Sequence, residues 1–153
     1  MIKPFSLQPL VHLSQQKNDA AAKKFGQLNR QQQAAQAKLD TLIQYRKDYQ
    51  ARFQEAVQSG MSQSDMCNFQ NFIQRLDEAI AQQSDTNEQA RNMVQTGRTE
   101  LQDTQRNMKS FDTLAQRHME SEKKLEAKSE QRQQDEHTGR NATIKAATAQ
   151  NES

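Results

Sequence analysis

The stretch "AVQSGMSQSDM" (Ala56–Met66) decides the fold of this 153-residue chain. Gly60 suits the left-handed backbone conformation that often follows a helix end. Ser62 followed by Asp65 resembles a capping box that opens a new helix. The two prolines lie within the first nine residues, so no proline interrupts either side of this stretch. It predicts a turn over residues 59–63 between two helices.

Apolar residues recur every 3.5 positions on both sides of the turn, from Leu7 to Ala56 and from Met66 to Leu125. This heptad pattern is typical of helices that wind around each other in a left-handed coil. A short connection makes two such helices antiparallel neighbours. We expect an all-α fold, an antiparallel two-helix coiled-coil hairpin that forms a long rod. Pro9, together with Ser6 or Gln8, marks the entry into the first helix.

The expected hairpin occupies residues 1–137, with helices over about 8–58 and about 64–134. Residues 138–153 carry no heptad pattern and are expected to form a disordered tail. Pairing the a places of one helix with the d places of the other gives a register centred on Met61. In that register Phe25 faces Gly97 and Asn18 faces Thr104, so large meets small and polar meets polar. A slip of one heptad would place Asn18 against Phe111.

Polar residues interrupt the coiled-coil seam, which lowers its stability but fixes its register. They are Gln32, Arg46, Gln83 and Asn87. With these interruptions and no third layer, the open end of the hairpin is expected to be marginally stable. We therefore expect a partner to complete the coil there.

The composition excludes several classes of protein. Only 33% of the residues are hydrophobic, too few for a compact globular core. The net charge of +2 comes from mixed basic and acidic residues, which does not favour nucleic acid as a partner. Pro9 breaks the apolar residues near the start, so neither a signal peptide nor a membrane insertion is expected. The single cysteine, Cys67, fits a reducing, cytoplasmic compartment.

No motif for catalysis or for a cofactor occurs in the chain. Glycine is too scarce for a phosphate-binding loop, and the three histidines have no partners at metal-ligand spacing. His118 falls on a seam position and is interpreted as a packing residue, and Cys67 as an inert small residue. We therefore expect no enzyme activity, and no catalytic, cofactor-binding or metal-binding residues.

Five of the eight aromatic residues lie between Tyr45 and Phe72. Tyr49, Phe53 and Phe69 fall on seam positions near the turn. Tyr45 and Phe72 fall on g positions beside the seam, where a soluble coiled coil usually carries charged residues. Half-exposed, outward-facing aromatics there indicate a protein contact. The predicted partner-binding strip consists of Leu42, Tyr45, Tyr49, Phe72, Leu76 and Ala79.

Three segments resemble the FliJ family of flagellar export proteins. They are "FSLQPLVHL" (Phe5–Leu13), "LDTLIQYRKDY" (Leu39–Tyr49) and "NFQNFIQRLDEAIAQQ" (Asn68–Gln83). The resemblance implies a small non-catalytic stalk and adaptor of the flagellar type III export apparatus, located in the cytoplasm at the inner face of the cell membrane. It implies insertion in the hexameric export ATPase ring (FliI-like), promotion of its activity, and contact with the cytoplasmic region of the export gate protein FlhA and with export chaperones.

The resemblance assigns the gate contact to a strip near the turn, and the matching positions are those of the predicted partner-binding strip. If the turn end meets the gate, the open end would sit in the ATPase ring. Charged residues of that end would then face acidic ring loops, although an ordinary solvated helix face explains them equally well. They are Arg117, Lys123, Lys124, Lys128 and Arg132.

Two other functions fit a heptad protein of this composition. One is a general coiled-coil scaffold that self-associates through its seam, and the other is a coiled coil that binds nucleic acid. The second predicts a single basic stripe and binding that weakens steeply with salt. The mixed charges of this chain rank it below the export function.

Overall fold

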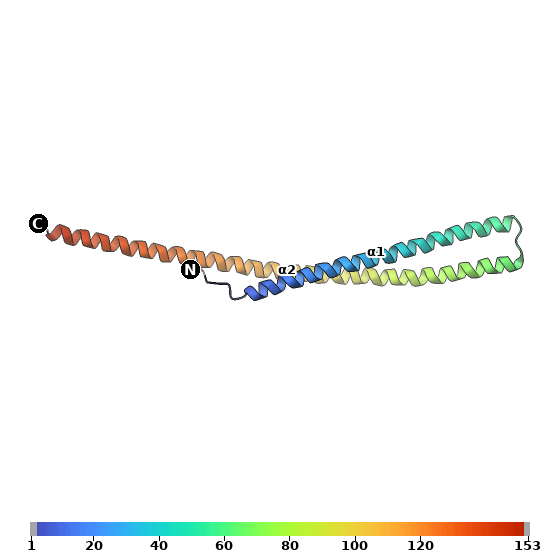
Figure 1. The fold of residues 1–153 in the computed structure, drawn as a ribbon, viewed down its shortest axis with the longest axis horizontal. Coiled ribbons are helices and arrows are strands. Elements are labelled where there is room, and N and C mark those ends of the chain that lie inside the picture. The colour runs from blue at the N-terminus through green and yellow to red at the C-terminus, as the bar shows by residue number, and fades with distance from the viewer. Residues whose placement is uncertain (1–2, 152–153) are drawn as a thin grey trace. The chain divides into compact units, whose positions relative to one another are not determined.

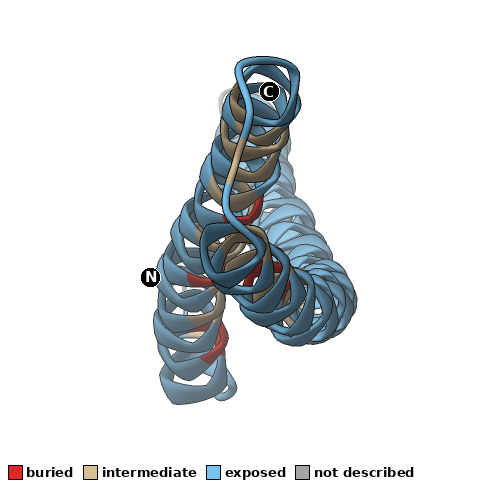
Figure 2. Ribbon diagram, turned by 90° about the vertical axis from the view of Figure 1, so that its right-hand side faces the viewer, coloured by how far each residue is buried: buried red, intermediate tan, exposed pale blue. Residues whose placement is uncertain are grey.

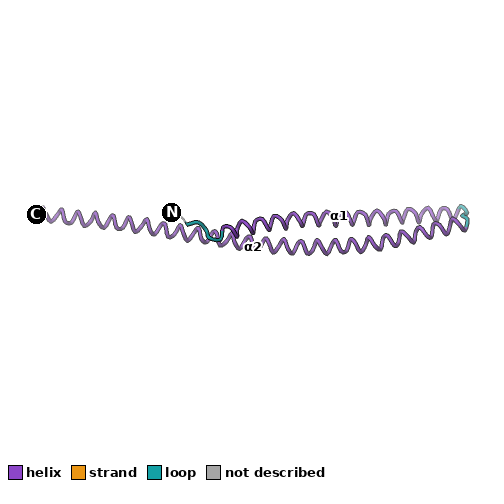
Figure 3. The backbone as a smooth tube through the Cα atoms, turned by 60° about the horizontal axis from the view of Figure 1, so that its bottom comes forward, coloured by secondary structure: helices purple, strands orange, loops and turns teal. Residues whose placement is uncertain are grey.

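The computed structural model describes residues 3–151. It contains helix α1 (Gln8–Gln58) and helix α2 (Gln63–Asn151), and no strand occurs among the described residues. The described chain falls into two packing units, one of residues 17–104 and one of residues 3–16 with 105–151. In the first unit α1 and α2 run side by side in opposite directions from the turn (Figures 1 and 3). The expected helical hairpin is confirmed.

The turn has the chemistry that its sequence predicts. Gly60 adopts a φ of 87°, and its N–H donates to the Val57 carbonyl at 3.2 Å. A non-glycine residue would strain this backbone conformation. The Asp65 N–H donates to Ser62 Oγ at 3.2 Å, which caps the first turn of α2. Gly60 ends one helix and Ser62 starts the next within three residues, so the chain must reverse direction here.

The core of the residue 17–104 unit is a narrow seam between the two helices. Its buried apolar side chains are Leu28, Leu39, Leu76 and Val94, and no large side chain is completely enclosed anywhere in the described part of the chain. Figure 2 shows the buried positions as short red patches, with intermediate positions in tan and most of the remaining helix surface exposed. Such a low apolar content can fill a seam between two helices, but not a globular interior.

The register agrees with the sequence prediction. A Cβ placed on Gly97 would lie 3.6 Å from Cδ2 of Phe25, so these two residues face each other. Thr104 Oγ1 donates to Asn18 Oδ1 at 3.2 Å, and the rings of Phe53 and Phe69 pack with centroids 5.5 Å apart. These contacts lie at both ends of the unit, so one register holds along its whole length.

The second unit combines the start of the chain with the later part of α2. Within it, Val11 and Ser14 are buried, and Phe5 packs on the ring of His118 with centroids 5.3 Å apart. His118 Nε2 lies 2.9 Å from the Lys3 carbonyl oxygen, so this nitrogen carries the hydrogen and donates it. His118 is therefore a packing residue, as its seam position predicts.

The expected disordered tail is wrong as a description of residues 138–151. These residues continue α2 as far as Asn151, and every residue from 123 to 151 is exposed. The heptad pattern fades there, which removes a packing partner but does not remove helix propensity. After Gly139 the segment has no proline and four alanines, which favours the helix. Residues 152–153 of the expected tail, and residues 1–2 of the expected hairpin domain, lie outside the described residues.

Candidate docking surface near the turn

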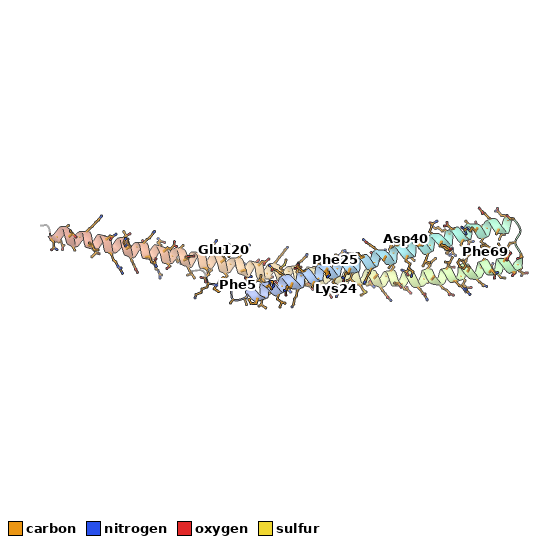
Figure 4. All side chains as sticks on the ribbon, viewed as in Figure 1. Phe5, Lys24, Phe25, Asp40, Phe69 and Glu120 are labelled. Carbon is orange, nitrogen blue, oxygen red and sulfur yellow. The ribbon has the colours of Figure 1, made fainter. Side chains whose placement is uncertain are left out.

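Three aromatic contacts join α1 to α2 beside the turn. Tyr49 lies between two rings of α2, with centroids 4.9 Å from Phe69 and 4.4 Å from Phe72. Phe53 packs on Phe69 from the next turn of α1. Figure 4 labels Phe69 close to the turn, on the opposite helix from these two residues. The interplanar angles of 41–53° are those of tilted ring pairs, which contribute beyond simple area burial.

Of the six residues of the predicted strip, Tyr45 is the most exposed, with 57% of its surface accessible. Tyr49, Phe72, Leu42 and Ala79 are half-buried. Tyr45 therefore has little packing to lose in the free protein and much surface to bury against a partner. Half-buried residues around one exposed aromatic are a common arrangement at protein interfaces.

Phe72 differs from the sequence prediction, whereas Leu76 lies in the seam, where its heptad position places it. Phe72 does not face outward in the way that Tyr45 does, because its ring packs on Tyr49. Leu76 is only 8% exposed and belongs to the seam. The heptad position alone missed the first point, because a g residue near a turn can reach across the seam to a large partner ring. The surface of the strip is thus centred on Tyr45, and Leu76 supports it from below.

Tyr49 also borders an open hollow of about 400 Å³ at the turn, together with Ala56, Met61 and Phe69. Ser59, Gly60, Asp65 and Asn68 line the rest of it. The hollow leaves one side of the aromatic cluster open to solvent. Sequence patterns do not reveal it, because it depends on how far the two helices separate as they approach the turn.

The sequence pattern did not predict an ion pair that lies on the other edge of the seam. Arg46, at a seam position, turns outward to Asp77, and its Nε and NH2 groups donate to the two carboxylate oxygens. The hydrogen bond and the charge of Asp77 raise the pKa of Arg46 above its ordinary value. A bidentate pair of this kind fixes the relative position of the two helices. Arg46 and Asp77 lie on different helices, so their pairing follows from the way in which the two helices are aligned.

The predicted ATPase-facing residues all lie exposed on α2. Because α2 is continuous here, a repeat of 3.6 residues per turn places Arg117, Lys124, Lys128 and Arg132 on one stripe. Lys123 is rotated by about 100° around the helix from Lys124 and lies outside this stripe. Four of the five residues therefore form a basic stripe along α2, and Lys123 lies outside it.

Among residues 3–151 no group of histidine, cysteine, aspartate and glutamate side chains is arranged to hold a metal ion. In the same range, no helix has a stretch apolar and long enough to cross a membrane. Cys67 is exposed.

Comparisons with known proteins agree with this architecture. The Flagellar FliJ proteins of Escherichia coli and Salmonella typhi are each 26% identical over 140 residues, covering 92% of this chain and 95% of theirs. A solved Chlamydia trachomatis protein, described as a YscO homologue, superposes with a TM-score of 0.59 at 16% identity. That superposition covers 88% of this chain and 91% of the other, and supports the fold alone.

The sequence model of the flagellar FliJ protein family matches residues 3–146, nearly the whole chain. The match includes all of α1, the turn, the aromatic cluster, the basic stripe and α2 as far as residue 146. The chain therefore belongs to the flagellar FliJ protein family and is a component of the flagellar type III protein export apparatus.

Proposed function

We propose that this chain is a non-catalytic stalk and adaptor of the export apparatus. It inserts in the hexameric export ATPase ring, promotes the activity of the ring, and links it to the cytoplasmic region of the export gate protein FlhA. It also binds export chaperones. It acts in the cytoplasm, at the inner face of the cell membrane at the flagellar base.

One observation carries the gate contact in this proposal. Tyr45 is exposed beside the packed pair of Tyr49 and Phe72, close to the turn. The pair holds the surroundings of Tyr45 in place, so docking a partner there costs little conformational entropy. Leu42 and Ala79 extend the same surface on the two helices. An aromatic side chain presented by a preformed surface is a typical binding hot spot.

The ring contact in this proposal is supported by the basic stripe of α2. Arg117, Lys124, Lys128 and Arg132 present positive charge along one face of a helix. Opposite charges on a partner steer association and fix orientation. Helix α2 also continues to Asn151 with all its side chains exposed after residue 122, which leaves a long helical surface for a surrounding ring.

The direct test mixes the full-length protein with the export ATPase of its own cell and measures hydrolysis together with ring assembly. We expect both to increase with added protein until the rings are saturated. The purified protein alone should hydrolyse no ATP. If hydrolysis and ring assembly are both unchanged, the proposed stalk function is wrong, whether or not the protein binds the export gate.

A further inference from the structure

A hydrogen-bonded network of amide side chains lies in the middle of the seam. Asn87, only 5% exposed, accepts from Gln32 Nε2 at 3.3 Å and donates from its Nδ2 to Gln36 Oε1 at 2.7 Å. Arg91 NH2 donates to the same Gln36 oxygen at 3.1 Å. Four residues of the two helices thus form one connected set, with Asn87 at its centre.

One helical turn nearer the hairpin turn, Gln83 extends the polar part of the seam. It is 9% exposed, and its Nε2 donates to the backbone carbonyl of Ala35 at 3.0 Å. Among residues 3–151 no buried side-chain nitrogen or oxygen lacks a hydrogen-bond partner. These polar groups are therefore satisfied in the observed register, and their burial carries little penalty there.

A slip of one heptad that brings Leu42 opposite Asn87 would break the network. In that slipped register Leu39 takes the place of Gln32 and Ile43 takes the place of Gln36. Neither of these side chains can hydrogen-bond with Asn87. A buried amide without a partner is costly. Layers of leucine, valine and isoleucine discriminate less between registers, because these residues replace one another across a seam with small changes in packing. The pairing of Phe25 with Gly97 is the more selective of the apolar contacts.

The docking surface depends on this choice of register. Tyr45 and Tyr49 come from α1, whereas Phe72 and Ala79 come from α2. A slip of one heptad would move the two sets apart by roughly 10 Å along the helices. We propose that the network of Gln32, Gln36, Asn87 and Arg91 is a positioning device, which sets the register and thereby assembles the docking strip from both helices. The link to docking rests on the proposed function, whereas the register itself does not.

The test replaces the two seam amides of the network by leucine, Gln32→Leu with Asn87→Leu, in the full chain carrying Cys67→Ser. The exposed pair Gln33→Leu with Gln89→Leu is the control, because it also replaces two amide side chains by leucine, one on each helix, but outside the seam. Cysteine pairs report the register. Lys24→Cys with Glu100→Cys reports the observed one, because these side chains form an ion pair at 3.2 Å. Gln31→Cys with Glu100→Cys reports a slip of one heptad.

We expect the leucine variant to melt at a higher temperature than the parent, since it buries more apolar surface. We expect its slipped-to-observed ratio of disulfide formation to rise by roughly tenfold or more, the order set by one unsatisfied buried amide. The control variant should keep the parental ratio. A parental ratio in the leucine variant would overturn the positioning role, and its higher melting temperature would show that misfolding was not the reason.

Binding of the FlhA cytoplasmic region to the same variants separates the two proposals. If binding weakens in proportion to the fraction of the protein in the slipped register, the result supports the proposal that the network assembles the strip. A slipped register with undiminished binding would overturn both the two-helix strip and its dependence on the network, while leaving the role in register intact.

Discussion

Phe25 and Gly97 face each other across the seam, and the glycine leaves the space that the ring and Leu28 occupy. A Cβ at position 97 would lie 2.7 Å from Leu28 Cδ1 and 3.6 Å from Phe25 Cδ2. The close atom is the end of a flexible side chain, so a small residue can be accommodated by a rotation of Leu28. A large residue at position 97 cannot be accommodated in this way. This contact shows how a seam with one glycine reaches dense packing.

The first prediction concerns Gly97. We expect Gly97→Leu to destabilise the protein by about 1–3 kcal/mol through overpacking. Gly97→Ala should be near neutral, because the gain in helix propensity of about 1 kcal/mol offsets the shift of Leu28. Gly26→Ala is the control: its Cβ would meet only Arg30 NH1, at 3.7 Å, so the gain should appear undiminished. Thermal and urea unfolding measure all three, and a Gly97→Leu protein as stable as the parent would contradict the packing.

The second prediction separates Tyr45 from Phe72. Tyr45→Ala should leave the melting temperature nearly unchanged and weaken binding to the FlhA cytoplasmic region about tenfold or more, as expected for a hot-spot aromatic. Phe72→Ala should weaken binding and, in addition, lower the free energy of unfolding by about 1–3 kcal/mol, because the Phe72 ring packs on Tyr49. Circular dichroism and titration calorimetry give the two readouts. Equal losses of stability in both variants would mean that Tyr45 is packed in solution.

The third prediction concerns the basic stripe. Lys124→Glu with Lys128→Glu should reduce the stimulation of the export ATPase, because both residues lie on the stripe. Lys123→Glu changes a neighbouring residue of the same type that lies outside the stripe, and should retain most of the stimulation. The difference in ATPase stimulation between the two variants should shrink as the salt concentration is raised, because exposed charges are screened within about 10 Å at 0.1 M salt. Equal effects of Lys123→Glu and Lys124→Glu would argue against a stripe-specific contact.

The fourth prediction concerns the ion pair of Arg46 with Asp77. Because the pKa of Arg46 is raised by Asp77, the contribution of the pair is present at every pH below the ordinary pKa of an arginine and is lost only as the pH rises through the still higher folded value. The guanidinium therefore stays charged across the physiological range. We expect the difference in melting temperature between the parent and Arg46→Gln to be the same at about pH 6 and about pH 9. A difference that disappears by about pH 9 would mean that another group governs this position.

The fifth prediction concerns the exposed end of α2. Residues 126–151 have no buried side chain, and an isolated helix is only marginally stable in water. Their amide hydrogens should exchange much faster than those of residues 28–39, which include buried seam positions. Hydrogen exchange followed by mass spectrometry makes this comparison within one molecule. If the proposed ring contact is correct, adding the export ATPase should slow exchange in residues 126–151.

The sequence by itself determined the helices, the turn and the register. Gly60 and Ser62 act through local backbone chemistry, and heptad positions carry their own periodicity, so neighbouring residues contain the necessary information. The pairing of Phe25 with Gly97 followed from volume and the pairing of Asn18 with Thr104 from polarity. Among the helices, the turn and the register, only the continuation of α2 beyond residue 137 was misjudged, because a missing heptad pattern was taken as a missing helix.

The tertiary structure alone decided which residues of the strip are available to a partner. Phe72 and Tyr45 occupy equivalent heptad positions, yet one packs on Tyr49 and the other stays exposed. The outcome depends on which ring lies across the seam and how far the helices separate near the turn. The same is true of Arg46 with Asp77 and of the amide network around Asn87. These contacts join residues distant in sequence, and long side chains select partners only after the two backbones have been placed.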